Sequence, residues 1–146
     1  MQTVEKVIGY EFTNTELREE ALLAAGTSVS DPAVDGDPRG NKRLALVGDA
    51  VLQLIILEKW YGQATDTVVG SEILKESVSN AALQVRASKA HLQNLIRLNP
   101  SQHGQAPQET LASTVEALVG AVWFDCNGDM DVVRGVMGKL GLFNHN

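Results

Sequence analysis

The chain has one cysteine, Cys126, among its 146 residues, and only 5% of the residues are aromatic. A single cysteine cannot form an internal disulfide, which excludes a disulfide-stabilised fold and favours a reducing compartment, the cytoplasm or an organelle matrix. No apolar run reaches the about 20 residues of a membrane helix. The opening MQTVEKVIGY lacks the basic flank and apolar stretch of a secretion signal. We therefore expect an intracellular protein that does not enter a membrane.

Positive charge is also scarce. Twelve Lys and Arg residues stand against 18 Asp and Glu residues, so the formal net charge is −6. This balance argues against unspecific binding of polyanions, and nucleic-acid binding would need a local basic patch or bound metal ions. The composition, 44% apolar and 21% charged, is typical of globular proteins. The length fits a single domain over residues 1–146.

Apolar residues recur mostly at helical spacing and strand signals are weak, which predicts an all-α fold. A capping box of Thr13 and Glu16 should open the first long helix, and Ser71 is expected to cap a helix in the middle of the chain. Two polar loops are expected, at residues 26–40 and 101–109. Helices are predicted over about 15–25, 41–61, 71–96 and 111–125, and from Asp129 or Asp131 to near Gly141.

Two carboxylates interrupt the most apolar of these helices, Asp49 in the helix 41–61 and Glu116 in the helix 111–125. A carboxylate in such surroundings is costly unless it is paired, hydrogen-bonded or bound to a cation. Each could simply pair locally, for example with Arg43. Facing carboxylates on two central helices are also how helical bundles build oxygen-rich metal sites. Both alternatives are compatible with the residues alone.

Four segments resemble motifs of the ribonuclease III family and occur in the family's order. NKRLALVGDAVL, residues 41–52, is similar to the family signature, which is close to NERLEFLGDAVL. LASTVEALVGAVWFD, residues 111–125, is similar to the second acidic segment, which is close to LADTVEALIGAIYLD. IGYEF at residues 8–12 and VSNAAL at residues 78–83 resemble two further family motifs. The resemblance spans most of the chain.

This resemblance implies the helical bundle of a ribonuclease III endonuclease domain, working as a homodimer on structured or double-stranded RNA. In the family, magnesium-activated water cleaves the phosphodiester. Clustered carboxylates suit such hard cations, which neutralise charge at the reacting phosphate. Cations would then bridge an acidic pocket to RNA, which reconciles the negative net charge with an RNA partner.

The resemblance also implies four acidic ligand positions, of which two are changed. The signature helix supplies Ala45 and Asp49, and the later helix supplies Ser113 and Glu116. Another position that is commonly acidic in the family holds Lys42. We therefore expect Asp49 and Glu116 to be the catalytic and metal-binding residues, with Ser113 as an additional weak oxygen donor. One weakly bound Mg²⁺ or Mn²⁺ is expected, and not a pair of ions.

Three basic residues are candidates for binding RNA phosphates: Lys42, Arg43 and Lys75. For Lys42 the alternative is a solvated side chain in the first turn of its helix. For Arg43 the alternative is an ion pair with Asp49 or Glu116. For Lys75 the alternative is a scattered surface residue, which is the more common situation.

Two functional hypotheses follow. The first is a ribonuclease III-like endoribonuclease with a reduced carboxylate site, which binds structured RNA and cleaves it. The second is a catalytically inactive RNA- or protein-binding structural subunit on the same fold, as in mitochondrial ribosomes. The changes at Ala45 and Ser113 motivate the second hypothesis. We expect no double-stranded-RNA-binding domain, because the sequence ends soon after the last predicted helix.

Overall fold

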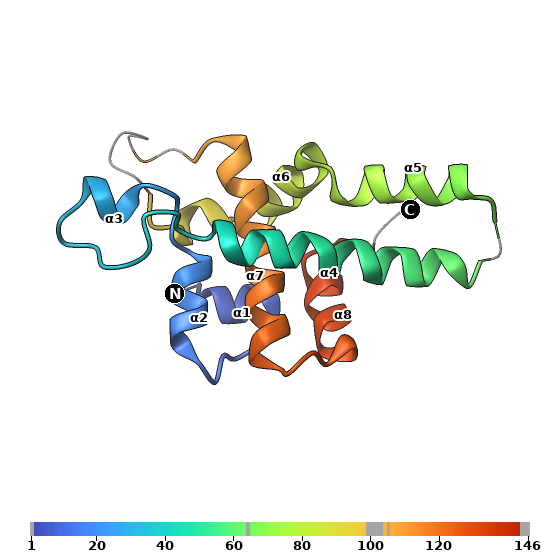
Figure 1. The fold of residues 1–146 in the computed structure, drawn as a ribbon, viewed down its shortest axis with the longest axis horizontal. Helices are drawn as coiled ribbons and strands as arrows, with labels where there is room; N and C mark the ends of the chain where they lie inside the picture. The colour runs from blue at the N-terminus through green and yellow to red at the C-terminus, as the bar shows by residue number, and fades with distance from the viewer. Residues whose placement is uncertain (1, 64, 99–103, 105, 144–146) are drawn as a thin grey trace.

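The computed structural model describes residues 2–63, 65–98, 104 and 106–143, and the regular elements found there are helices (Figure 1). Within these residues, extended pairing is limited to an isolated parallel bridge between Leu23 and Arg97. The predicted all-α class is therefore confirmed. The elements are α1 (Val4–Ile8), α2 (Thr15–Ala21), α3 (Thr27–Ser30), α4 (Lys42–Tyr61), α5 (Thr67–Val78), α6 (Asn80–Lys89), a 3₁₀ helix η1 (Leu92–Leu95), α7 (Gln108–Asp125) and α8 (Met130–Lys139).

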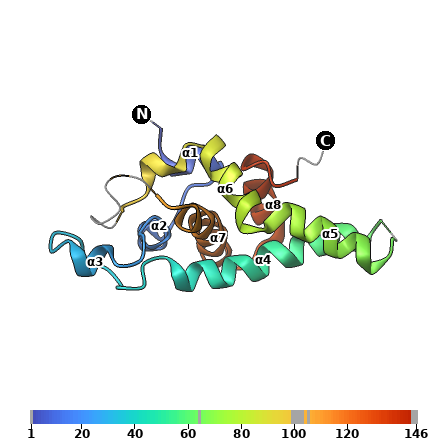
Figure 2. The same cartoon turned by 90° about the horizontal axis from the view of Figure 1, so that it is seen from above.

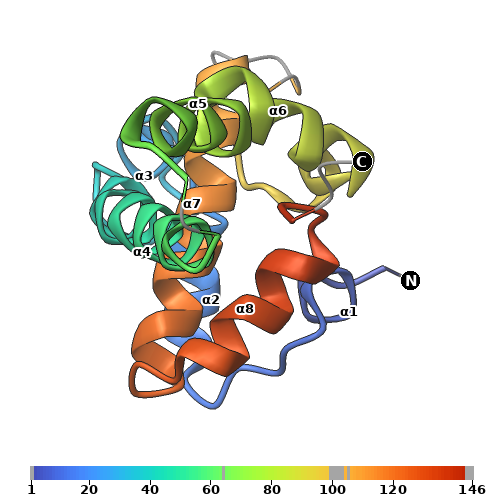
Figure 3. The ribbon, with the colours of Figure 1, turned by 90° about the vertical axis from the view of Figure 1, so that its right-hand side faces the viewer.

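Helix α7 is the centre of the fold. From Leu111 to Val122 every residue except Glu116 is buried. Helices α2, α4, α6 and α8 surround α7, as two further views show (Figures 2 and 3). Burial of this apolar segment supplies much of the hydrophobic driving force for folding. The single carboxylate within the segment is therefore held in place by the packing of α7.

Helix α4 crosses α7 at very short range because each helix presents a glycine at the contact (Figure 1). A Cβ atom added to Gly48 would lie 1.7 Å from the Glu116 backbone oxygen. One added to Gly120 would lie 2.3 Å from the Leu44 backbone oxygen. Any larger residue would force the two backbones apart. The crossing thereby fixes the relative position of Asp49 and Glu116, one on each helix.

The end of α2 differs from the prediction. The helix stops at Ala21, not near residue 25, because the residues that follow bond to a distant segment. The Arg97 N–H donates to the Leu22 carbonyl, and the Ala24 N–H donates to the Arg97 carbonyl. These two backbone hydrogen bonds form the parallel bridge between Leu23 and Arg97, and the residues that make them cannot continue α2.

The start of α2 also differs. Its cap is Asn14, whose side chain accepts a hydrogen bond from the Glu16 N–H. The prediction that Thr13 caps this helix was therefore wrong. Asparagine is as good a helix cap as threonine. Residue type alone therefore could not show which of the two adjacent residues caps α2.

The helix predicted over residues 71–96 is two helices and a 3₁₀ helix. Asp66 caps α5 by accepting from the Val69 N–H, so the expected cap, Ser71, lies inside the helix. At Ser79 the backbone is extended, and the serine hydroxyl accepts from a backbone N–H three residues further on to start α6. A cap of this kind starts a new helix without interrupting the apolar spacing. Periodicity alone therefore could not reveal the break.

Two short helices were not predicted, because one turn is too short to show a periodic pattern. Helix α1 is capped by Thr3, and α3 lies within the segment 26–40 that was expected to be only a loop.

Helix α7 begins at Gln108, so the second loop ends before residue 109. The rest of the expected loop at residues 101–109 lies partly outside the described residues.

The remaining boundaries follow the sequence closely. Helix α4 spans Lys42–Tyr61, as predicted to within a residue. Asn127 and Gly128 have positive φ values, as the expected turn requires, and Asp129 caps α8. None of the described helices is both long enough and apolar enough to cross a membrane.

Because α4 and α7 touch at glycines, we expect the stability of the fold to be highly sensitive to substitution of Gly48. Gly48→Ala should lower the free energy of unfolding by roughly 3 kcal/mol or more, because the new methyl group overlaps the α7 backbone. Urea unfolding followed by circular dichroism measures this loss. Gly135→Ala in α8 is the matched control, because nothing lies within 4 Å of its added Cβ. We expect the control to be neutral or stabilising by about 0.5–1 kcal/mol. Equal stability of both variants would contradict the close crossing.

Candidate active site

The carboxyl groups of Asp49 and Glu116 meet where α4 crosses α7. Asp49 directly follows the contact residue Gly48, and Glu116 itself supplies the backbone oxygen that Gly48 faces. The two side chains lie within hydrogen-bonding reach of one another. One turn further along α4, the Gln53 side-chain amide donates to Asp49 Oδ2 at 2.9 Å. Gln53 thereby orients the Asp49 carboxylate beside its partner.

The electrostatics of the pair are set by burial and mutual repulsion. Partial burial, the negative charge of Asp49 and the hydrogen bond to Asp49 together raise the pKa of Glu116 from 4.5 to about 7. The ammonium of Lys42 opposes this rise in the Glu116 pKa. At neutral pH Glu116 is therefore protonated in about half of the molecules. A cation of higher charge could replace that proton, because it would relieve the same repulsion.

Lys42, in the first turn of α4, contacts Ser113 on α7 across the helix crossing. Its Nζ donates to Ser113 Oγ at 3.0 Å and lies 3.4 Å from Glu109 Oε1. Ser113 is only 6% exposed, while the Lys42 side chain remains 44% exposed. These residues line an open cavity of about 280 Å³. Lys42 is therefore not simply solvated, as one alternative expected, but bonded to the neighbouring helix.

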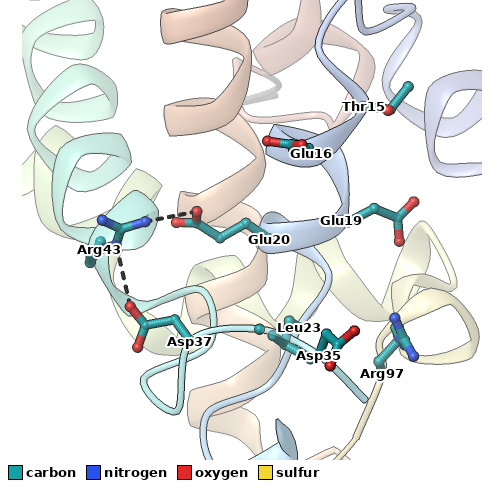
Figure 4. Close-up of a pocket in the computed structure, with 10 residues that line it drawn as sticks. Thr15, Glu16, Glu19, Glu20, Leu23, Asp35, Asp37, Arg43 and Arg97 are labelled. Carbon is teal, nitrogen blue, oxygen red and sulfur yellow. Dashed lines mark hydrogen bonds and ion pairs between the residues drawn. The ribbon is translucent and has the colours of Figure 1, made fainter. Parts of the chain in front are cut away.

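Arg43 points away from the carboxyl pair, into a different cavity. Its guanidinium contacts Glu20 at 2.9 Å and Asp37 at 3.8 Å (Figure 4). The alternative expected from the sequence, an ion pair with Asp49 or Glu116, was therefore wrong. Because both partners of Arg43 are acidic, its charge is already compensated within the chain.

Acidic side chains make up half of the ten residues that line the cavity beside Arg43. It has a volume of about 440 Å³ and lies between α2 and the loop that precedes α4 (Figure 4). Its acidic residues are Glu16, Glu19, Glu20, Asp35 and Asp37. A hydrogen bond from the Arg39 side chain lowers the pKa of Asp37 to about 2. Because five acids outnumber the two arginines of the lining, Arg43 and Arg97, this cavity would repel a phosphate, and Arg43 is poorly placed to bind RNA.

The other predicted residues are placed differently. Ala45 is 6% exposed and belongs to the apolar core, so it contributes only packing. Lys75 is exposed and lines a separate hollow on α5. The structure brings four of the predicted residues together around the crossing: Asp49, Glu116, Ser113 and Lys42.

Three polar residues of this region were not anticipated from the sequence. Gln53 could have been found, because it lies one helical turn after Asp49 and on the same face. Glu109 lies one turn before Ser113 and could have been found by the same rule. Glu20 could not, because its ion pair depends on how α2 packs beside α4.

The donor set limits what the site can hold. Within the described part of the chain, no group of three or more His, Cys, Asp or Glu side chains converges in a way that would hold a metal ion. Asp49 and Glu116 offer two carboxyl groups, and Ser113 offers a neutral oxygen that already accepts from Lys42. Mg²⁺ commonly uses one or two protein carboxylates and completes its shell with waters and phosphate oxygens. The described residues therefore supply at most two carboxyl groups and one neutral hydroxyl to any such ion.

Comparison with solved structures defines the class of this domain. Two structures of the nuclease domain of ribonuclease III from Campylobacter jejuni match it with TM-scores of 0.81 and 0.78. Each covers 97% of this chain at 21% sequence identity, and the matches extend over 96% and 93% of the two solved chains. At this identity the likeness shows the fold, which is the all-helical fold of that nuclease domain.

The family model described as Ribonuclease-III-like matches residues 28–139. The chain therefore belongs to the Ribonuclease-III-like family. Ribonuclease 3 from Syntrophotalea carbinolica is 33% identical over 142 residues, and that from Campylobacter curvus is 28% identical over 145 residues. These alignments cover 94% and 96% of this chain, but 60% of each relative. The chain thus spans about 60% of the length of these curated relatives.

The raised pKa of Glu116 predicts how stability depends on pH. Between pH 4.5 and about 7 the folded chain holds a proton on Glu116 that the unfolded chain releases, so stability falls as pH rises through this window. Glu116→Gln should remove this pH dependence of stability. Its stability relative to the wild type should therefore be higher at pH 8 than at pH 5. The full shift of the Glu116 pKa sets an upper limit of about 3 kcal/mol on this difference in the free energy of unfolding. Partial solvent exposure of Glu116 reduces the expected difference to about 1 kcal/mol.

Urea unfolding of both proteins at pH 5 and pH 8 measures this difference. Asp49→Asn provides an independent check, because it removes the neighbouring charge that helps to raise the Glu116 pKa. In that background the effect of Glu116→Gln should depend less on pH. If Glu116→Gln changed stability equally at both pH values, the pKa of Glu116 would not be raised in the folded protein.

Proposed function

We propose that this chain is a ribonuclease III-type endoribonuclease domain that binds structured or double-stranded RNA and cleaves it with one divalent cation. The observation that carries the proposal is the convergence of Asp49 and Glu116 at the crossing of α4 and α7. Membership of the family and the nuclease-domain fold support RNA as the substrate class.

Asp49 and Glu116 would hold the cation, Mg²⁺ or Mn²⁺, with Ser113 at its margin. A carboxyl group that is partly protonated at neutral pH beside a second carboxyl group has the chemistry to exchange its proton for a cation. The ammonium of Lys42 and the missing carboxylates at Ala45 and Ser113 make the binding weak. When bound, the ion would supply positive charge to the phosphate oxygens and acidify the attacking water.

The RNA backbone would lie beside the carboxyl pair. Lys42 and Ser113 present an ammonium and a hydroxyl to an open cavity, where an RNA phosphate could sit. Double-stranded RNA is recognised mainly through phosphates and 2′-hydroxyls, which such donors fit. Arg43 and Lys75 are weaker candidates for phosphate contacts, because both lie outside this cavity.

We also propose a homodimer that uses the outer face of α4. Three large apolar side chains on this helix are well exposed: Leu46 at 76%, Leu54 at 54% and Tyr61 at 79%. With Ala50 and Leu57 they recur at spacings of three or four residues, so they form one stripe along the helix. An exposed stripe of this kind is typical of a protein interface. One of the solved nuclease domains is described as having a region involved in dimer formation.

A second candidate function is a binding subunit that does not cleave RNA. The specific observation in its favour is the contact between Lys42 and Ser113, which places a protein cation beside the positions where acids are absent. Such a site would bind RNA or a protein partner for a structural purpose. For an RNA partner, the two functions differ only in whether hydrolysis occurs.

Cleavage of double-stranded RNA in Mg²⁺ or Mn²⁺ tests the proposal. We expect slow cleavage by the wild-type chain and a loss of roughly 100-fold or more in Asp49→Ala and in Glu116→Ala, because each removes half of the carboxylate pair. Product formation is measured on labelled RNA in gels. Cleavage that survives in both variants would overturn the proposed site.

An inactive wild type would favour the binding subunit, and restoring acidic residues then separates the two candidates. The triple variant Lys42→Glu, Ala45→Glu, Ser113→Asp supplies the acids that the family pattern implies. Gain of metal-dependent cleavage would mean that only ligands are missing. A folded but inactive triple variant would mean that the surface has diverged for another task.

The dimer is tested at the apolar stripe. Leu46→Glu should shift the wild-type dimer to a monomer, because a charge buried in an apolar contact costs several kcal/mol. Light scattering coupled to size-exclusion chromatography measures the mass. Val85→Glu, on α6, replaces another exposed apolar residue and should leave the dimer intact. A monomeric wild type at micromolar concentration would contradict the proposal.

A further inference from the structure

The residues that depart from the family pattern are in contact with one another. Lys42 stands where an acid is common, Ser113 stands where an acid is expected, and the Lys42 ammonium donates to the Ser113 hydroxyl at 3.0 Å. Two acids at these places would repel each other and require a cation between them. Lys42 and Ser113 need no bound cation between them, because the Lys42 ammonium itself carries a positive charge. The two changes therefore form one unit.

The Lys42 ammonium still has the capacity to bind a ligand. An ammonium has three donors, of which one is used by Ser113 and one points to Glu109. Glu109 is 77% exposed and its oxygen lies 3.4 Å away, so this ion pair is weak and easily exchanged. The hydroxyl of Ser113, which accepts from Lys42, has its own proton to donate. Both groups line the same cavity of about 280 Å³.

We propose that Lys42, supported by Ser113, binds a backbone phosphate of RNA directly, so that RNA binding at this cavity does not require a divalent cation. The proposal deepens the RNA-binding function proposed above and rests on it. A phosphate oxygen would take the place of Glu109 beside the ammonium and accept a second hydrogen bond from Ser113. The Lys42 ammonium thus takes over one task that a bound cation would perform, which is attracting the phosphate.

Ser113 contributes by limiting the freedom of the lysine. Its side chain is buried on the central helix α7, whereas Lys42 has a long side chain in the first turn of α4. The hydrogen bond holds the ammonium beside the cavity, which lowers the entropic cost of binding a phosphate. Ser113 is therefore a positioning residue in this arrangement, and Lys42 is the binding residue.

The experiment measures the affinity for a labelled RNA duplex by fluorescence anisotropy in EDTA, over a series of salt concentrations. We expect the wild type to bind in EDTA. Lys42→Met should weaken binding by about three- to tenfold and lower the slope of log affinity against log salt by about 0.7–1, the value for one lost phosphate contact. Lys42→Arg should retain most of the affinity, because it keeps the charge.

Lys6→Met is the matched control, because Lys6 is exposed on α1, which lies on the opposite side of α7 from α4 (Figures 2 and 3). It should leave both affinity and salt slope unchanged. Lys42→Glu should make RNA binding dependent on added Mn²⁺. Circular dichroism of each variant verifies that it is folded.

The outcomes separate this inference from the function on which it rests. If the wild type binds RNA only with Mn²⁺, or if Lys42→Met and Lys6→Met behave alike in EDTA, the inference is overturned while RNA binding stands. If the wild type binds no RNA with or without Mn²⁺, both are overturned. Binding in EDTA that depends on Lys42 supports the inference whether or not the RNA is cleaved.

Discussion

The close crossing of α4 and α7 is the constraint on which the rest of the structure depends. Gly48 and Gly120 remove the side chains that would otherwise separate the two backbones. Because Asp49 adjoins one glycine and Glu116 lies one turn from the other, the same contact brings the two acids together. Packing and chemistry therefore share the same few residues. A change that relaxed the crossing would disturb the core and the carboxyl pair at once.

The carboxyl pair persists in an apolar setting because several contacts reduce its cost. Glu116 has a pKa of about 7, so a proton neutralises its carboxyl group in about half of the molecules at neutral pH. Gln53 donates to Asp49, and the ammonium of Lys42 lies close enough to favour the charged form of Glu116. The charge of the site thus depends on a proton at Glu116 and on the ammonium of Lys42. This local charge is a more direct guide to its chemistry than the net charge of −6.

The sequence was informative where local pattern determines structure and uninformative where distant segments meet. The two central helices were predicted to within a few residues, because their apolar content and flanking turns are local signals. The end of α2 was not, because backbone bonds to Arg97 determine it. The meeting of Asp49 and Glu116 was expected from the family motifs. The two partners of Arg43 come from a neighbouring helix and a loop, which no spacing rule connects.

Lys42, Ala45 and Ser113, where the resemblance to the family implies acidic residues, have different physical surroundings and cannot be considered one at a time. Ala45 is buried among apolar residues, so a carboxylate there would need its own partner or a cation. Ser113→Asp alone, with Lys42 retained 3.0 Å away, would create an ion pair in place of a metal ligand. An acid at position 113 can therefore serve a metal only when the lysine is also replaced. The contact between Lys42 and Ser113 couples the two positions, so the charge at this part of the site depends on both residues together.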